Sequence, residues 1–193
     1  ITPNTAAILL EPIQAGGGIL FPPDGFMANL RKLCDQHRVL LIWDEIQTGF
    51  CRTGKRFAWE HEAAKPDLMC LGKALGGGIM PVSAVVGNRA GVGVVPPGGH
   101  GPALGGNPLG AGWADARLGL RMKDALRGMN HPAVEDVRGR GLLVGLEFRE
   151  GTDTKRLSKA FLEEGILTKE TRSRTFRFAP PLTITDAELD EGI

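Results

Sequence analysis

Val39-Leu40-Leu41-Ile42-Trp43 is an uninterrupted apolar run, and directly after it the chain turns polar in Asp44-Glu45-Ile46-Gln47-Thr48-Gly49. A short continuous apolar run is typical of a strand in a parallel sheet that is buried on both faces. A second apolar run, Leu68 to Leu71, leads into Gly72, Lys73 and a cluster of glycines. A buried strand that ends in a carboxylate, followed by a strand that ends in a lysine, suggests a Schiff-base site. The lysine would hold an aldehyde cofactor, and the carboxylate would hold a protonated ring nitrogen.

Around these two strands the sequence predicts an α/β fold in two parts. Asp24 is predicted to cap a helix that runs to about His37, and residues 91–108 are predicted to be loop because they are rich in glycine and proline. The other predicted elements are strands over 6–13, 82–86, 142–148, 166–169 and 175–178, and helices over 109–129, over 154–164 and from Asp186. We therefore expect part of a mostly parallel sheet in residues 1–108, an inter-domain helix in 109–130 and a smaller α+β part in 131–193.

Composition narrows the class of protein. Hydrophobic residues make up 42% of the chain, which is enough to bury a core, and the formal net charge of +1 argues neither for nucleic acid nor for a membrane surface. No apolar run approaches the roughly 20 residues of a membrane span. The cysteines Cys34, Cys51 and Cys70 form no disulfide pattern, and no His/Cys cluster suggests a metal site. A reducing compartment fits, either the cytoplasm or the mitochondrial matrix.

Four motifs follow one another along the chain: Glu11-Pro12-Ile13-Gln14, Asp44 to Gly49, Arg52-Thr53-Gly54 and Leu71-Gly72-Lys73-Ala74-Leu75. Together they resemble the class III aminotransferases, which are fold-type I enzymes that depend on pyridoxal 5'-phosphate (PLP). Within this class the chain most resembles the ornithine aminotransferases, through residues 100–109, 137–142, 168–171 and 177–182. The resemblance implies the C-terminal part of the PLP-binding large domain, followed by an incomplete small C-terminal domain.

The resemblance also implies roles for five residues. Lys73 would form the Schiff base with PLP and then carry a proton between the substrate carbon and the cofactor. Asp44 would pair with the pyridine nitrogen, and Gln47 would bind the phenolic oxygen of the ring. Ile42 shares a strand face with Asp44 and could pack beneath the ring. Arg177 would bind a substrate carboxylate through its forked guanidinium.

Each of these residues also has an ordinary structural interpretation. The alternatives are a surface lysine for Lys73, a helix cap or solvated loop acid for Asp44, a polar loop residue for Gln47, ordinary core for Ile42 and a solvent-facing strand-edge residue for Arg177. The apolar run before Asp44 argues against a solvated acid, since a buried acid needs a partner. The neighbouring Glu45 is interpreted as structural, in contact with backbone or with Arg52.

Two places depart from the ornithine aminotransferase pattern. Pro102 and Ala103 stand where that family has serine and threonine, and the family's threonine hydroxyl binds the cofactor phosphate. Losing one hydrogen bond to a charged group costs about 1.5–3 kcal/mol. Gly16 stands where ornithine enzymes have a glutamate that masks the carboxylate-binding arginine, so Arg177 would stay unmasked. We also expect the chain to start midway through the large domain, after the glycine-rich turn that grips the phosphate.

The sequence therefore predicts a PLP-dependent aminotransferase that moves an amino group from ornithine onto a 2-oxo acid and forms glutamate semialdehyde. A close alternative is another class III enzyme, acting on acetylornithine or 4-aminobutyrate, or a dialkylglycine decarboxylase. An alternative of a different kind is a noncatalytic fragment or degenerate homologue. The expected partners are an amino acid, a 2-oxo acid and a second copy of the full-length protein in a homodimer, with no nucleic acid and no membrane.

Overall fold

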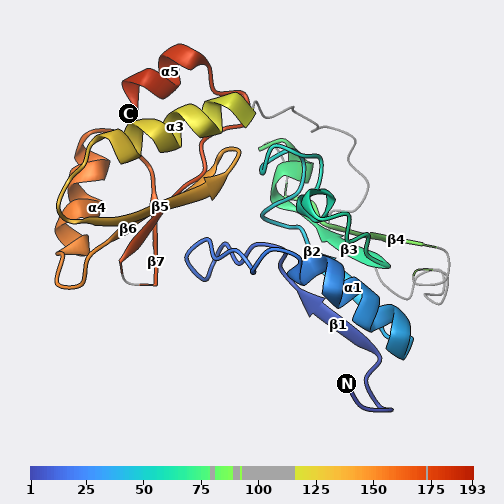
Figure 1. The fold of residues 1–193 in the computed structure, drawn as a ribbon. Coiled ribbons are helices and arrows are strands. Elements are labelled where there is room, and N and C mark those ends of the chain that lie inside the picture. The colour runs from blue at the N-terminus through green and yellow to red at the C-terminus, as the bar shows by residue number, and fades with distance from the viewer. Residues whose placement is uncertain (79–80, 89–91, 93–115, 173) are drawn as a thin grey trace. The chain divides into compact units, whose positions relative to one another are not determined.

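The computed structural model describes residues 1–78, 81–88, 92, 116–172 and 174–193 of the 193-residue chain. The chain forms two compact units (Figure 1). The first contains Ile1–Ile13, Phe21–Phe50 and the described residues of Lys55–Gly112, and the second contains Gln14–Leu20, Cys51–Gly54 and the described residues of Trp113–Ile193. Among the described residues, no helix is long and apolar enough to cross a membrane.

The first unit is built on a sheet with the strand order β1-β2-β3-β4. The strands β1 (Ala7–Leu10), β2 (Leu40–Asp44) and β3 (Leu68–Leu71) are parallel, and β4 (Ala84–Gly87) is antiparallel to β3. This agrees with the mostly parallel sheet predicted from the apolar runs. The helices whose bounds lie within the described residues of this unit are α1 (Phe26–His37) and two single 3-10 turns, η1 (Ala58–His61) and η2 (Lys73–Gly76).

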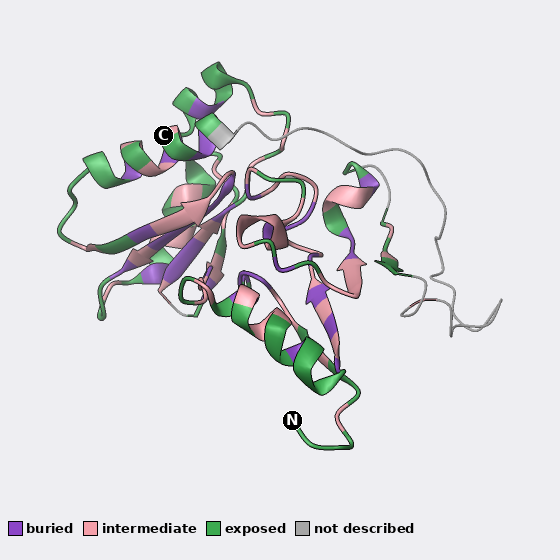
Figure 2. Cartoon of the chain, turned by 45° about the vertical axis from the view of Figure 1, so that its right-hand side comes forward, coloured by how far each residue is buried: buried purple, intermediate pink, exposed green. Residues whose placement is uncertain are grey.

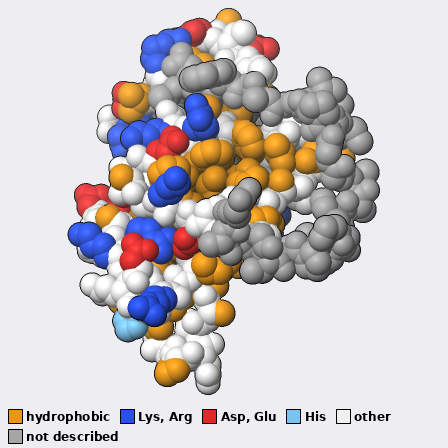
Figure 3. Space-filling model, turned by 90° about the vertical axis from the view of Figure 1, so that its right-hand side faces the viewer, with side chains coloured by type: hydrophobic (Ala, Val, Ile, Leu, Met, Phe, Trp, Pro, Cys, Tyr) orange, Lys and Arg blue, Asp and Glu red, His pale blue; other side chains and the backbone are white. Residues whose placement is uncertain are grey.

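One face of this sheet is better buried than the other. Along β2, Leu41 and Trp43 are fully buried and pack with Met27 and Cys34 of α1, and the Trp43 Nε1 donates to the Ala64 carbonyl at 2.8 Å. Leu40, Ile42 and Asp44, which alternate with them, are only half-buried (Figure 2). Within the described residues, β2 is therefore fully buried on the face that packs on helix α1 and half-buried on the other face, whereas the apolar run led us to expect burial on both faces. Hydrophobic side chains also gather on the molecular surface (Figure 3). A separate example of an exposed apolar side chain in this sheet is Val85 of β4, which is 50% exposed.

The start of α1 corrects a second expectation. Asp24 does not cap this helix: the N-cap is Gly25, with φ +79° and no side-chain cap hydrogen bond. The carboxylate of Glu62 accepts hydrogen bonds from the amides of Met27 at 3.0 Å and Ala28 at 3.4 Å. The first N–H groups of a helix lack partners within the helix, and here a side chain distant in sequence supplies one.

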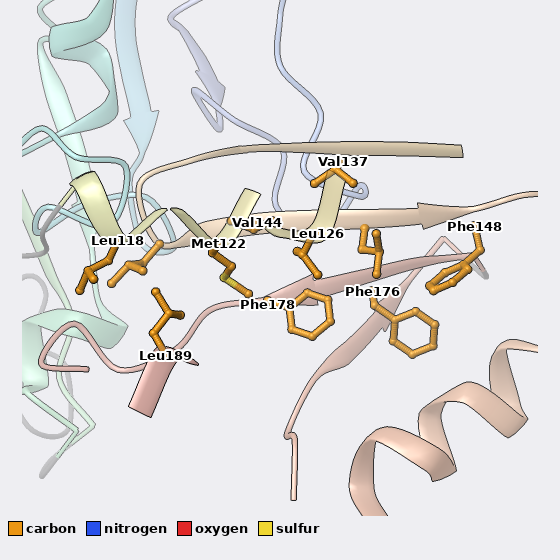
Figure 4. Close-up of a cluster of buried hydrophobic side chains, with 11 residues drawn as sticks. Leu118, Met122, Leu126, Val137, Val144, Phe148, Phe176, Phe178 and Leu189 are labelled. Carbon is orange, nitrogen blue, oxygen red and sulfur yellow. The ribbon is translucent and has the colours of Figure 1, made fainter. Parts of the chain in front are cut away.

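The second unit is an antiparallel sheet with the strand order β5-β6-β8-β7. Its strands are β5 (Val134–Arg140), β6 (Leu143–Phe148), β7 (Lys169–Thr171) and β8 (Thr175–Phe178), and its helices are α3 (Ala116–Gly128), α4 (Thr154–Glu163) and α5 (Asp186–Glu191). The core lies between one sheet face and the helices, and Figure 4 shows its aliphatic and aromatic side chains. Phe161 of α4 meets Phe176 and Phe178 edge to face, with ring centroids 5.2 and 5.7 Å apart.

Strand β5 was not predicted. Its sequence, Val134-Glu135-Asp136-Val137-Arg138-Gly139-Arg140, contains only two apolar side chains. This edge strand pairs with β6 along its length, buries Val137 in the core and forms the cross-strand ion pair of Arg138 with Glu147. The predicted strand at 166–169 is displaced, since β7 begins at Lys169.

Two short segments from the first 60 residues belong to the second unit. The guanidinium of Arg138 donates to the carbonyls of Gly18 at 2.7 Å and Ile19 at 3.2 Å, and thereby holds Gln14–Leu20. The guanidinium of Arg52 donates to the carbonyls of Leu142 at 3.2 Å and Pro180 at 2.6 Å. The predicted division into 1–108, 109–130 and 131–193 did not foresee these segments. Its boundary stays a prediction, because residues 93–115 lie outside the described part.

Candidate active site

Asp44 and Lys73 follow two neighbouring parallel strands. Asp44 is the last residue of β2, and its register partner on β3 is Cys70, three residues before Lys73. Because parallel strands end at the same sheet edge, the two side chains start from the same edge, where open α/β sheets bind ligands. Asp44 is half-buried, and its Oδ1 accepts the Ile46 N–H at 3.0 Å. Ile42 and Asp44 lie on the same face of β2, as the strand alternation predicts.

Lys73 begins the single turn η2 and is held in an uncommon backbone conformation. Its φ is +43°, a left-handed value that costs a non-glycine residue of the order of 1–3 kcal/mol. Strained residues persist only where their surroundings hold them, and they cluster at functional sites. The exposed Lys73 Nζ donates a hydrogen bond to Oε1 of the half-buried Gln47. The structure thus brings together two of the predicted cofactor contacts, from the turn after β2 and the turn after β3.

Glu45 anchors the turn that carries Gln47. Its side chain is fully buried and accepts hydrogen bonds from the Thr48 hydroxyl at 2.5 Å and from the backbone amides of Ala58 and Trp59, both at 3.0 Å. Burial raises the pKa of this carboxyl, and the three donors act in the opposite direction. The predicted contact with backbone is confirmed. No sequence pattern marks Ala58 and Trp59 as the partners, since backbone amides carry no residue signature.

Arg52 bonds to carbonyl groups of the second unit rather than to a carboxylate. Burial lowers the pKa of its guanidinium to about 10. The arginine lies beside the residues that follow β8, the strand that carries Arg177, because Pro180 comes two residues after the end of β8. Arg52 therefore helps to hold the backbone that follows β8.

Arg177 lies on β8 of the second unit. Its neighbours Phe176 and Phe178 point into the core, so Arg177 lies on the opposite sheet face, where it is half-buried. Lys73 lies in the first unit and Arg177 in the second, so the predicted grouping of Arg177 with Lys73 stays a prediction. Pro102 and Ala103 lie outside the described residues. Gly16 is described, and a Cβ placed there would meet no atom within 4 Å.

Comparisons with known proteins bear on what these residues do. The class III aminotransferase family model matches residues 1–120 and 114–193. The chain belongs to the class III aminotransferases. This class III chain is 44% identical over 208 residues to an ornithine aminotransferase of Oceanobacillus iheyensis, and the match covers 100% of the chain and 52% of that protein. The chain spans about half the length of the curated relatives it matches.

The fold of the chain is also similar to solved structures of aminotransferases. The ornithine aminotransferase of Toxoplasma gondii ME49 is 39% identical, with a TM-score of 0.89 over 98% of this chain and 50% of that one. A second Toxoplasma gondii structure, crystallized in the presence of oxidized glutathione, is 40% identical, with a TM-score of 0.88 over 98% of this chain and 49% of that one. It reveals partial occupancy of PLP at its active site. The prediction of a fold-type I α/β architecture is confirmed.

Proposed function

We propose that this chain is the Lys73-bearing part of a PLP-dependent ornithine aminotransferase. The enzyme would transfer the terminal amino group of ornithine to a 2-oxo acid, with 2-oxoglutarate as the expected acceptor, and release glutamate semialdehyde. The observation that carries this proposal is the contact between Lys73 Nζ and Gln47 Oε1 at the sheet edge where Asp44 ends β2. The chain is 44% identical to a curated ornithine aminotransferase, which supports ornithine as the proposed amino donor.

The residues present fit PLP. Lys73 provides an exposed primary amine, and Ile42 provides an apolar side chain on the half-buried sheet face beside Asp44. Among the described residues, the side chain of Asp44 accepts one hydrogen bond, at Oδ1, so Oδ2 can accept the N–H of a ring nitrogen. Gln47 offers a side-chain amide whose N–H groups can donate to a ring oxygen. When bound, PLP supplies an aldehyde that joins amines covalently and a ring that stabilises negative charge on the substrate carbon.

Each of the predicted site residues would then have a separate role in the reaction. The Lys73 amine would accept a proton from the substrate carbon and deliver it to the cofactor. The Asp44 carboxylate keeps the ring nitrogen protonated, and Gln47 orients the ring through its oxygen. Arg177 holds the substrate carboxylate with two parallel N–H bonds. We include in the proposal a homodimeric full-length protein, which rests on the family resemblance. We place it in a reducing compartment, the cytoplasm or else the mitochondrial matrix, because its three cysteines form no disulfide pattern.

Borohydride trapping tests the cofactor part of the proposal. The purified chain is incubated with PLP, reduced with borohydride and digested, and the pyridoxyl mass is located on its peptides. We expect the label on Lys73, and we expect Lys73→Ala to lose it. Lys32→Ala, which removes an exposed lysine of α1 in the same unit, is the control and should keep the label on Lys73. Label spread over surface lysines would contradict a selective site in this chain.

A second candidate is another class III aminotransferase that takes an α-amino donor. The observation in its favour is Gly16, which lies in a segment of the second unit together with Arg177 and leaves open space where a side chain could stand. The resemblance implies that a glutamate near this position masks the carboxylate-binding arginine in ornithine enzymes. Donor screening of the full-length protein, with ornithine, acetylornithine, 4-aminobutyrate and α-amino acids, separates the two candidates by their kcat/KM values.

A further inference from the structure

A single row of residues crosses the whole sheet of the second unit. Arg138 of β5 pairs with Gly145 of β6, Gly145 pairs with Arg177 of β8, and Arg177 pairs with Lys169 of β7. Directly paired residues place their side chains on the same face of a sheet. This is the face away from the helices, because the residues flanking the row, such as Phe176, belong to the core on the other side. The row therefore places three cations and one glycine on the sheet face opposite the helices, where Ile19 packs at Gly145 and Lys169 is exposed.

The acidic side chains on this face are paired with Arg138 and Arg174. Arg138 binds Asp136 at 2.7 Å and also Glu147. Arg174 binds Glu147 at 2.9 Å and Glu135 at 2.6 Å. Among the described residues, the ion pairs formed on this sheet include neither Arg177 nor Lys169. These two cations stand on adjacent strands without a carboxylate between them.

The direct pairing of Lys169 with Arg177 does not stabilise the fold. Like charges directly opposite each other on neighbouring strands destabilise a sheet. Gly145 places no side chain beside Arg177, so β6 supplies no carboxylate in this row, and a Cβ there would approach Ile19 to 3.3 Å. An anion that binds between Arg177 and Lys169 would relieve the repulsion and use both charges.

We propose that Lys169 is a second substrate-binding cation, which with Arg177 forms a site for the carboxylate of the amino acid or 2-oxo acid. Arg177 supplies the forked, two-bond contact to the carboxylate, and Lys169 adds a mobile ammonium that approaches from β7. Lys169 thereby favours substrates with a full negative charge at this end over esters and amides. The inference rests on the proposed function, because it deepens the carboxylate-binding role assigned there to Arg177.

The test measures carboxylate binding without PLP. The isotope-labelled chain is titrated with 2-oxoglutarate at fixed ionic strength, and the NMR shifts of the Arg177 side chain and of the β7 and β8 amides are followed. We expect saturable shifts. Lys169→Gln should weaken binding by about two- to fivefold, the range that one partly exposed ion pair covers. Arg177→Lys should weaken it by roughly tenfold, because the fork is lost.

Lys155→Gln is the matched control, because it removes the same charge from an exposed position on α4. It should leave the affinity unchanged. Because Lys169 repels Arg177, Lys169→Gln should also leave the Tm of the chain unchanged or raise it, which a purely structural lysine would not do. Unchanged affinity in Lys169→Gln, a lower Tm in that variant, or no saturable shift in the unaltered chain would each overturn the inference. Trapping at Lys73 does not depend on this titration, so the two proposals can fail separately.

Discussion

Glu45 is the immediate neighbour of Asp44 in sequence and has the opposite environment. Asp44 ends its strand half-buried, whereas Glu45 is 0% exposed and accepts three hydrogen bonds. The three donors join the turn after β2 to η1, so one buried carboxylate fixes the backbone from which Gln47 reaches Lys73. At the scale of single residues, the position of Gln47 in the candidate site therefore depends on the Glu45 carboxylate, which need not contact a ligand.

We predict that Glu45→Ala destabilises the first unit by about 2–4 kcal/mol, because a buried donor left without a partner costs about 1–3 kcal/mol. Denaturant unfolding followed by Trp fluorescence measures the loss. Glu62→Ala is the comparison, since Glu62 also accepts two backbone amides but is only half-buried. It should cost less. Equal losses in the two variants would show that burial of the Glu45 carboxylate adds nothing.

The positions of two candidate site residues, Asp44 and Lys73, could be predicted from the sequence because each follows an apolar run, whereas the roles of the site residues stay predictions. Asp44 and Lys73 follow apolar runs, and this local pattern predicts their shared sheet edge once both strands are parallel. The partners of Glu45 could not be predicted, since they are backbone amides 13 and 14 residues away. The carbonyl partners of Arg52 lie 90 and 128 residues away, and only the folded chain brings them together.

At the scale of elements, Asp67 joins helix α1 to the sheet. Its carboxylate accepts hydrogen bonds from the Leu41 amide at 2.9 Å, from Arg31 Nη1 at 2.8 Å and from the Asn88 side chain at 3.2 Å. Burial alone would raise the pKa of Asp67, but the Leu41 amide and the Arg31 guanidinium outweigh burial and hold the pKa below its ordinary value. The charged form is therefore favoured by folding.

This lowered pKa predicts a specific acid response. The stabilisation is fully present above the unfolded-state pKa of about 3.9 and is lost as the pH falls through the lower folded-state pKa. Urea unfolding between pH 6 and pH 2.5 should show a decline below about pH 4. Asp67→Asn should be less stable than the unaltered chain near neutral pH and should show a smaller decline. A decline of the same size in both proteins would contradict the assignment.

Elements were predictable where hydrophobicity alone marks them. The runs at 68–71 and 175–178 were predicted at the observed bounds of β3 and β8, because each is a short apolar or alternating segment. Hydrophobicity does not mark the edge strand β5, because Val134 and Val137 are its only apolar side chains and its partner strand β6 comes later in the sequence. The start of α1 was misassigned because its amides are satisfied by Glu62, 35 residues from Met27.

At the scale of the whole molecule, position in the sequence does not decide the unit to which a residue belongs. We predict that Arg52→Met destabilises the second unit, although Arg52 lies in the first third of the chain. It removes two hydrogen bonds from a half-buried charged group, each worth about 1.5–3 kcal/mol. Hydrogen exchange should quicken in β6 and β8 and stay unchanged in β2 and β3. Arg56→Met, at an exposed position of the first unit, should leave both sheets protected.

The segments Gln14–Leu20 and Cys51–Gly54 have a consequence for how such a protein could be divided or recombined. Each unit is assembled from several stretches of the sequence, so no single cut in the gene yields the second unit whole. A piece that begins after residue 112 would lack the carbonyls of Gly18 and Ile19, leaving Arg138 without two acceptors. It would also lack the Cys51–Gly54 loop, whose backbone lies so close to Gly141 that a Cβ there would meet Arg52 at 2.6 Å. The second unit is therefore not a transferable module. Fusing residues 113–193 end to end to another protein should not give a folded unit unless Gln14–Leu20 and Cys51–Gly54 are included.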